Sequence, residues 1–143
     1  MTAPMDFLEV QEGMTVAQEY LITKEIYSQF LAAFGDENQL HIDEDYAVSR
    51  GFAGKVMHGA ILNGFISHFL GMVFPARNVI IQSVQIDFKN PNYQDDKLQL
   101  RMTVAQKSEA VRTVVLKFEF YNATQNYVTA KGKVQAGFLE KKA

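Results

Sequence analysis

The feature that most constrains the fold of this chain is a change of hydrophobic period at Pro75. Residues 59–73 are apolar on nearly all sides of a helix, which predicts a buried helix. After Pro75, apolar and polar residues alternate in four segments, which is the period of strands with one buried face. These segments are residues 84–88, 98–104, 116–120 and 128–136. One-sided strands are typical of an antiparallel sheet, so we predict an α+β fold whose sheet wraps around the long helix.

The first half of the chain adds a strand and two shorter helices to this prediction. Residues 14–21 favour a strand. Thr23 suits the N-cap of a helix that Gly35 ends, and Asp43 opens a short helix that runs to Ser49. One sheet covers only part of a central helix, so we expect a homodimer in which a second copy completes the core or the pocket.

Composition and charge limit the partners and the reactive groups that we expect for this chain. The length suits a single domain over residues 1–143, and hydrophobic residues make up 48 % of the chain. The net charge of −2 gives no reason to expect a nucleic acid or a membrane surface as partner. The chain has no cysteine, which excludes a thiol nucleophile and thiolate metal sites. Residues 1–13 lack the features of a signal peptide, so we expect a cytoplasmic protein.

Residues 34–47 hold an acid–base pair in a short polar segment between apolar helices. Asp36 supplies a carboxylate and His41 an imidazole. Further along the chain, Gly59 stands at the start of the long predicted helix, where backbone N–H groups have no partner within the helix. A pair of proton-transfer groups beside a free amide suits chemistry on a carbonyl compound.

The same segment resembles the signature of a known family. Residues 35–43 read Gly-Asp-Glu-Asn-Gln-Leu-His-Ile-Asp and are followed by Tyr46 and Ala47. This resembles the pattern Gly-Asp-x-Asn-Pro-Leu/Ile-His-x-Asp of the MaoC-like dehydratases, which include the (R)-specific enoyl-CoA hydratases. The family pattern continues with a Phe, a His-Gly pair at the head of a helix, and Phe-x-x-Pro. The matching residues here are Phe52, His58, Gly59, Phe88 and Pro91.

Two positions depart from the family pattern. Phe34 stands where the family has Ser or Thr, and Gln39 stands where it has Pro. Without the fixed φ of proline, we expect other contacts to hold the turn between Asp36 and His41. We expect Phe34 to change the packing at the pocket wall. Both departures leave the chemically active side chains in place.

The resemblance implies a hot-dog fold with active sites near a dimer interface. The implied reaction is the reversible addition of water to a trans-2-enoyl thioester, which gives an (R)-3-hydroxyacyl thioester. The acyl carrier, coenzyme A or acyl carrier protein, is part of this substrate. The resemblance implies no metal and no redox cofactor.

Each candidate residue has a chemical role and a plainer structural alternative. Asp36 and His41 together position a water molecule, remove its proton and return one to C2 of the substrate; alternatively, they cap a helix and stabilise a turn. The N–H of Gly59 stabilises the thioester oxyanion, or the glycine serves close packing. Asn38 fixes the turn, and Ser67 supports Asp36 or bonds back to a helix carbonyl.

Two other functions remain open from the sequence. A hot-dog thioesterase hydrolyses the thioester and often carries an acidic residue on the central helix, whereas residues 59–73 contain no Asp or Glu. A non-catalytic module that binds acyl thioesters is the other alternative, and retention of Asp36 and His41 argues against it. For the acyl chain we expect an apolar slot, and the candidates for its lining are Phe65, Phe69, Leu70, Val84, Ile86 and Phe88, although we expect more of these side chains in the core than in the pocket.

Overall fold

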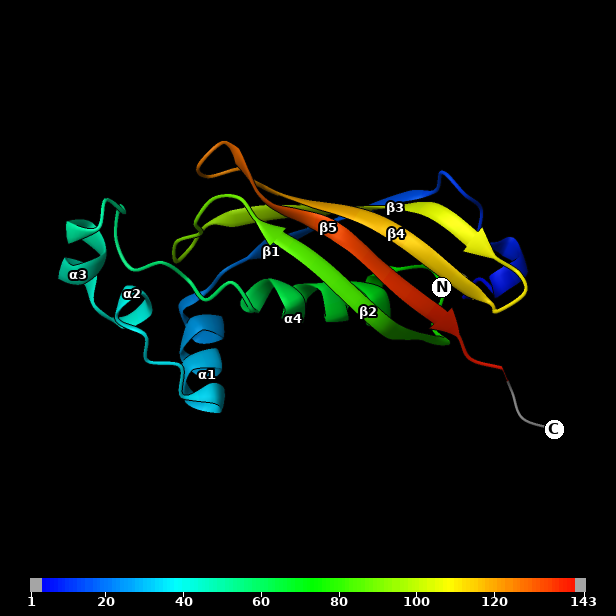
Figure 1. Ribbon diagram of the computed structural model, residues 1–143, viewed down its shortest axis with the longest axis horizontal. Helices are drawn as coiled ribbons and strands as arrows, with labels where there is room; N and C mark the ends of the chain where they lie inside the picture. The colour runs from blue at the N-terminus through cyan, green and yellow to red at the C-terminus, as the bar shows by residue number, and fades with distance from the viewer. Residues whose placement is uncertain (1–3, 141–143) are drawn as a thin grey trace.

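The computed structural model describes residues 4–140 and confirms an α+β fold. Figure 1 shows one curved sheet above a central helical segment, and a helical lobe beyond one end of the sheet. The α-helices are α1 (Lys24–Phe34), α2 (Gln39–Ile42), α3 (Glu44–Ser49) and α4 (Ile61–His68). The strands are β1 (Thr15–Leu21), β2 (Val79–Phe88), β3 (Lys97–Ser108), β4 (Thr113–Asn122) and β5 (Tyr127–Phe138).

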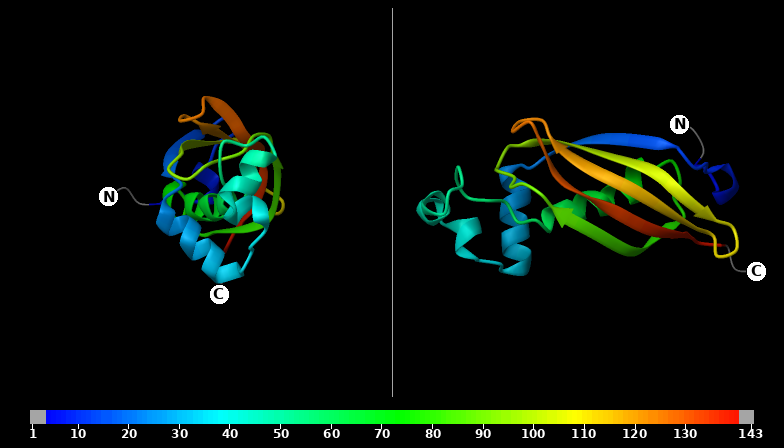
Figure 2. Two further views of the ribbon diagram at one scale, coloured as in Figure 1. Left: turned by 90° about the vertical axis from the view of Figure 1, so that its left-hand side faces the viewer. Right: turned by 45° about the horizontal axis from the view of Figure 1, so that its top comes forward.

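The sheet is antiparallel, and its strand order is β1-β3-β4-β5-β2. Every predicted strand is present, although β2 to β5 extend beyond the predicted limits because their ends pair regularly with neighbours. The concave face of the sheet wraps around α4, as the end-on view in Figure 2 shows. Leu62, Ile66 and Phe69 of the central helical segment are buried in this core together with Leu116 and Phe120 of β4. This is the arrangement expected of a hot-dog fold.

The central helix differs from the prediction in two respects. It begins at Ile61 rather than Gly59, and from Phe69 to Val73 it continues as a π-helix that ends before Pro75. Only one face of α4 is buried; Asn63, Gly64, Ser67 and His68 lie on an exposed face. The prediction of burial on all sides is therefore wrong for the single chain, because one sheet cannot surround a helix completely.

The edge strand β2 leaves apolar side chains uncovered. After a register shift between Ile81 and Ser83, Val84 pairs with Val134 and Phe88 with Ala130. Residues directly opposite each other share a face of the sheet, so Val84 and Phe88 face the same side as two buried residues. They are nevertheless 39 % and 54 % exposed, so the prediction of a fully buried face on this strand fails within one chain.

Helices α1 to α3 form the lobe, and their ends follow the predicted caps. The Thr23 side chain accepts a hydrogen bond from Ile26 N–H, and Gly35 adopts the left-handed conformation at the end of α1. Asp43 caps α3 through Tyr46 N–H. The short helix α2 between them was not predicted, because four residues show no hydrophobic period. No helix within residues 4–140 is long and apolar enough to cross a membrane.

Candidate active site

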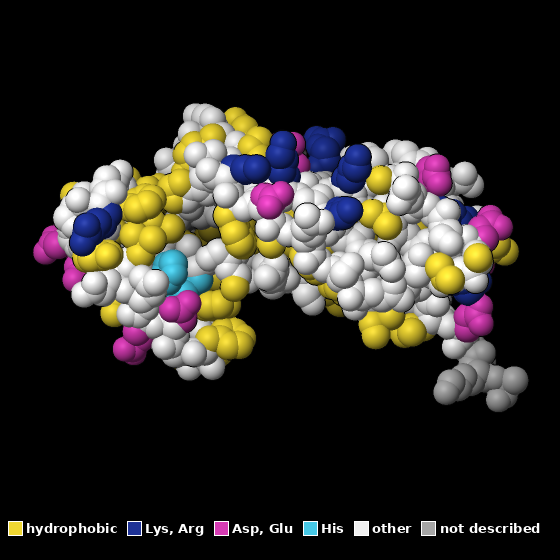
Figure 3. Space-filling view, viewed as in Figure 1, with side chains coloured by type: hydrophobic (Ala, Val, Ile, Leu, Met, Phe, Trp, Pro, Cys, Tyr) yellow, Lys and Arg dark blue, Asp and Glu magenta, His cyan; other side chains and the backbone are white. Residues whose placement is uncertain are grey.

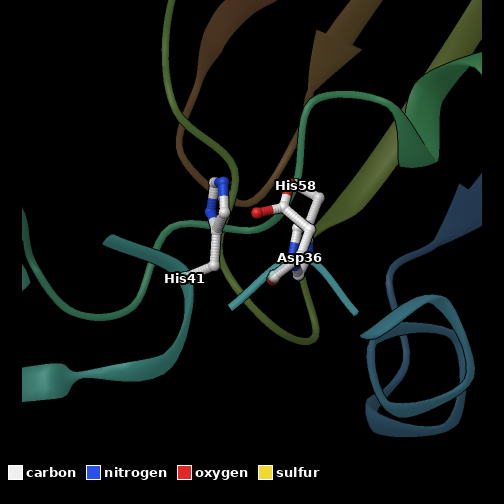
Figure 4. Close-up of side chains that lie close together, drawn as sticks. All are labelled: Asp36, His41 and His58. Atoms are coloured by element: carbon white, nitrogen blue, oxygen red, sulfur yellow. The ribbon is translucent and has the colours of Figure 1, made fainter. Parts of the chain in front are cut away.

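Asp36, His41 and His58 meet at the junction between the helical lobe and the start of α4. One carboxylate oxygen and one nitrogen of each imidazole all lie within 4.8 Å of one another. Figure 4 shows the Asp36 carboxylate directed toward the His41 ring. Histidine side chains reach the surface in Figure 3 where the lobe meets the main body, with acidic and apolar side chains nearby. The chain therefore brings together the two residues predicted as the acid–base pair, and adds a second imidazole.

The turn that carries Asp36 is held without proline. Asp36 follows the left-handed Gly35, and its Oδ1 accepts a hydrogen bond from Asn38 N–H at 3.3 Å. The Asn38 side chain caps α2 through Leu40 N–H at 3.0 Å, and the Asn38 carbonyl accepts from His41 N–H at 2.8 Å. Asn38 thus holds the turn by both backbone and side chain, which replaces the restraint that Pro would supply at position 39.

Hydrogen bonds determine which nitrogen of His41 can accept a proton. Its Nδ1 lies 2.7 Å from the Val56 carbonyl, which can only accept, so Nδ1 carries the hydrogen. The Nε2 of the neutral ring then has a free lone pair. The Tyr27 hydroxyl donates to the His41 carbonyl at 2.6 Å, which ties this residue to α1. The sequence does not reveal this role of Tyr27, because a hydrophobic pattern does not identify the partner of a hydroxyl.

Gly59 lies in the turn that precedes α4 and is partly exposed. Among residues 4–140, no group accepts a hydrogen bond from its N–H. A Cβ at this position would lie 3.0 Å from the Phe88 ring, which is tighter than an ordinary van der Waals contact. Gly59 therefore offers a free amide donor and, by lacking a side chain, leaves room beside it.

A cavity of about 1100 Å³ opens next to this site, between β1, α1 and α4. Its wall includes Ala60, which follows Gly59, and Phe30, whose ring centroid lies 4.8 Å from that of His58. Phe34 also lines it, as expected for the pocket wall. The other apolar lining residues are Leu21, Ile26, Ala33, Ile61 and Phe65. A large apolar space thus adjoins the polar cluster, a combination typical of small-molecule sites.

The predicted acyl slot agrees only in part with this cavity. Phe65 lines it, whereas Phe69 and Leu70 belong to the core under the sheet. At the cavity wall, burial raises the pKa of Tyr20 to about 12, and its hydroxyl is hydrogen-bonded to His68 Nδ1 at 2.9 Å. The slot was misplaced because hydrophobicity does not distinguish core residues from pocket residues.

A family model described as "MaoC like domain" matches residues 7–126. This chain belongs to the MaoC-like domain family. The predicted family is therefore confirmed.

Relatives of this MaoC-like protein carry hydratase and dehydratase names. The chain is 30 % identical over 98 residues to "(R)-specific enoyl-CoA hydratase" of Rhodospirillum rubrum, a match that covers 68 % of each chain. It is 28 % identical over 99 residues to "3-hydroxybutyryl-CoA dehydratase" of Methylorubrum extorquens, covering 66 % of this chain and 63 % of that one. The structure of unliganded R-hydratase PhaJ1 from Pseudomonas aeruginosa superposes with a TM-score of 0.85 at 22 % identity, covering 98 % and 89 % of the two chains. This similarity confirms the fold.

Ser67 does not meet Asp36 within one chain of this MaoC-like protein. It lies on the exposed face of α4, eight residues after Gly59, which is about 12 Å along a helix axis. His58, which precedes Gly59, is hydrogen-bonded to the Asp36 carbonyl. Asp36 therefore lies near the start of α4, at the opposite end of the helix from Ser67. A supporting role for Ser67 therefore requires that the residue come from a second copy.

The cluster also contains the donor types of a metal site, a carboxylate and two imidazoles. Two of the imidazole nitrogens are already engaged with backbone carbonyls: His41 Nδ1 with Val56 and His58 Nε2 with Asp36. The remaining His58 nitrogen is shielded from solvent. The accessible donors are thus one carboxylate and His41 Nε2, which suit a water molecule better than an all-protein metal site.

Proposed function

We propose that this MaoC-like protein catalyses (R)-specific hydration of trans-2-enoyl-CoA, or the reverse dehydration, with Asp36 and His41 sharing the reacting water. The observation that carries the proposal is the short separation between the Asp36 carboxylate and the His41 ring. One water molecule can bond to two groups up to about 5.6 Å apart, since each hydrogen bond is about 2.8 Å long. A separation within 4.8 Å meets this limit.

The free lone pair on His41 Nε2 suits removal of a proton from that water as it attacks C3. The Asp36 carboxylate accepts the water's other hydrogen bond. The pair then returns a proton to C2, so that a water molecule is added across the double bond with no net gain or loss of protons. Because both residues act on one water, the proton transfers are assigned to the pair.

Besides the two proton transfers, this reaction requires stabilisation of the negative charge that develops on the thioester oxygen. The unpaired Gly59 N–H, near the positive end of the α4 dipole, suits that oxygen. The apolar cavity beside it suits a substrate with a hydrocarbon chain. Coenzyme A or acyl carrier protein enters only as the carrier of the acyl group, so we propose no separate cofactor and no metal.

The test of this function is a paired assay on crotonyl-CoA and longer enoyl-CoA substrates. We expect loss of the conjugated-thioester absorbance with no release of free thiol, and an (R)-3-hydroxyacyl product on a chiral column. Thiol release with the double bond retained would identify a thioesterase instead. Absence of both signals at every chain length, with measurable binding, would identify an acyl-binding module.

Replacing Gly59 with Ala is expected to reduce kcat/KM by about 10²-fold. The added methyl group displaces the thioester, and a displacement of about 1 Å lowers the rate by a factor of this size. Stability should change little, because the crowded Phe88 ring is more than half exposed and is able to move. Enoyl-CoA kinetics and thermal unfolding measure the two effects. Gly71→Ala is the matched control, since open space surrounds that glycine. An active Gly59→Ala enzyme would show that the glycine serves packing alone.

A homodimer is the second part of the proposal. Val84 and Phe88 are exposed on the concave side of the sheet, on the edge strand β2, and one face of α4 is also uncovered. Edge strands with exposed apolar side chains favour pairing with another chain. A second copy related by a two-fold axis covers both surfaces and brings its own Ser67 toward the Gly59 end of α4.

We also propose that the protein is located in the cytoplasm.

Replacing Val84 with Lys is expected to convert the dimer to a monomer, because a charge at this position loses its hydration when a second sheet covers it. Light scattering measures the mass, and circular dichroism checks that the fold is retained. Ser83→Lys, one residue away on the opposite face of β2, is the control and should remain dimeric. A monomeric wild-type protein at micromolar concentration would contradict the proposal.

A further inference from the structure

His58 touches both members of the proposed acid–base pair but takes no part in the proton transfers assigned above. It is 3 % exposed. Its Nε2 lies 2.9 Å from the Asp36 carbonyl oxygen, and its ring centroid lies 4.1 Å from that of His41. One buried side chain therefore contacts the backbone of the carboxylate residue and the ring of the imidazole residue.

The direction of this hydrogen bond leaves one nitrogen of His58 without a partner. The Asp36 carbonyl can only accept, so His58 Nε2 carries the hydrogen. Its Nδ1 is then a buried acceptor with no hydrogen bond among the described residues. A buried polar atom without a partner lowers the stability of the fold. An apolar ring at this position avoids that cost, so stability alone does not explain a histidine between Phe30 and His41.

The His58 bond holds the backbone of Asp36, in addition to the bond from Asn38 to its side chain. The Asp36 side chain is exposed, and Asp36 follows Gly35 in a left-handed conformation rather than within a helix. Within residues 4–140, His58 Nε2 is the donor to the Asp36 carbonyl, and Asn38 N–H binds only the side chain of Asp36. Loss of the His58 donor thus frees the backbone at Asp36 while the separate anchors of His41, Val56 and Tyr27, remain.

We propose that His58 is a positioning residue that holds the Asp36 carboxylate at the distance from His41 that one shared water requires. This inference rests on the proposed hydratase function for its kinetic consequence, whereas its geometric content stands separately. The imidazole combines two features that neither Phe nor Gln supplies together: a flat ring that packs between Phe30 and His41, and an N–H directed at Asp36.

The kinetic test compares His58→Phe with His58→Gln. Phe keeps the ring and removes both the donor and the unpaired nitrogen, so the melting temperature should stay the same or rise. We expect kcat for crotonyl-CoA to fall about 10²-fold while KM changes less than about threefold, the consequence of a misplacement near 1 Å. Gln restores an N–H donor at a similar reach and should recover kcat to within about tenfold. If the Phe ring prevents folding, the smaller His58→Leu replaces it.

The structural test measures the separation of Asp36 and His41 in crystals of the same variants. In His58→Gln we expect a carboxylate oxygen of Asp36 to remain within 4.8 Å of a His41 ring nitrogen, as in the wild-type protein. In His58→Phe we expect this distance to exceed 4.8 Å. An unmoved Asp36 in His58→Phe, or unchanged kcat, would overturn the proposal. If wild-type protein lacks hydratase activity but Asp36 still moves, the proposed function fails and the positioning role stands.

Thr129→Val is the matched control for loss of a buried donor. The Thr129 hydroxyl is also buried and also donates to a backbone carbonyl, that of Asn90, at 2.7 Å. Valine keeps its shape. We expect lower stability and unchanged kcat. A similar loss of kcat in Thr129→Val would show that any buried hydrogen bond has this effect, and would overturn a specific role for His58.

Discussion

Asp36→Asn and His41→Asn are each expected to lower kcat/KM for crotonyl-CoA by about 10²–10⁴-fold, the usual contribution of a positioned acid or base. Both variants should fold. Asparagine at position 36 keeps an oxygen that accepts the Asn38 N–H, and asparagine at position 41 places an amide donor near the Val56 carbonyl. Neither amide takes up a proton at neutral pH. His41→Ala should be as inactive but less stable, because Val56 loses its donor.

Steady-state kinetics with thermal unfolding separates loss of chemistry from loss of fold. Glu37→Gln is the matched control, because Glu37 is an exposed carboxylate next to Asp36 and should keep nearly full activity. The double variant Asp36→Asn/His41→Asn should be no slower than the slower single variant, because the two residues act on one water. Near-wild-type turnover in either single variant would contradict the site assignment.

Asn122→Ala is expected to lower the free energy of unfolding by about 3 kcal/mol, because several buried polar atoms lose a partner and leaving a buried polar atom unsatisfied costs about 1–3 kcal/mol. Asn122 is 0 % exposed, and its Nδ2 donates to Asp96 Oδ2 at 2.7 Å and to Asn92 Oδ1 at 3.0 Å. Its Oδ1 accepts from two backbone N–H groups in the turn between β4 and β5. The substitution therefore leaves several buried polar atoms without partners.

Urea denaturation measures this change in the free energy of unfolding. The melting temperature of the variant should fall by roughly 10 °C, since a chain of this size loses about 2–4 °C per kcal/mol. The same network holds the loop of the candidate active site, because the Asn92 carbonyl accepts a hydrogen bond from Met57 N–H, next to His58. Asn90→Ala is the matched control: Asn90 is exposed and its side chain also donates to a carbonyl, so its loss should cost less than about 1 kcal/mol. Equal losses in the two variants would contradict the role of the buried network.

The family motif and the hydrophobic periods predicted most of the fold and the acid–base pair. Caps at Thr23, Gly35 and Asp43 act over a few residues, so local sequence was sufficient to predict them. Apolar residues recur at every second position along the strands, and the residues that pair between neighbouring strands follow the same period. Asp36 and His41 stand five residues apart, so a single turn brings them together.

Other features depend on contacts between distant residues. Tyr27, Val56 and His58 hold the pair from three separate segments, and no spacing in the chain reveals these bonds. The cavity differs from the predicted slot for the same reason, since β1, α1 and α4 meet there only in the folded chain.

The sequence alone therefore determined the class of fold, the family and the two side chains proposed to react, because periods, caps and a short motif are local properties. Only the tertiary structure decided which nitrogen of His41 is free, what anchors Asp36, and which face of α4 and β2 remains uncovered. Hydrogen-bond direction and burial depend on the position of atoms many residues away, and chain packing alone sets those positions.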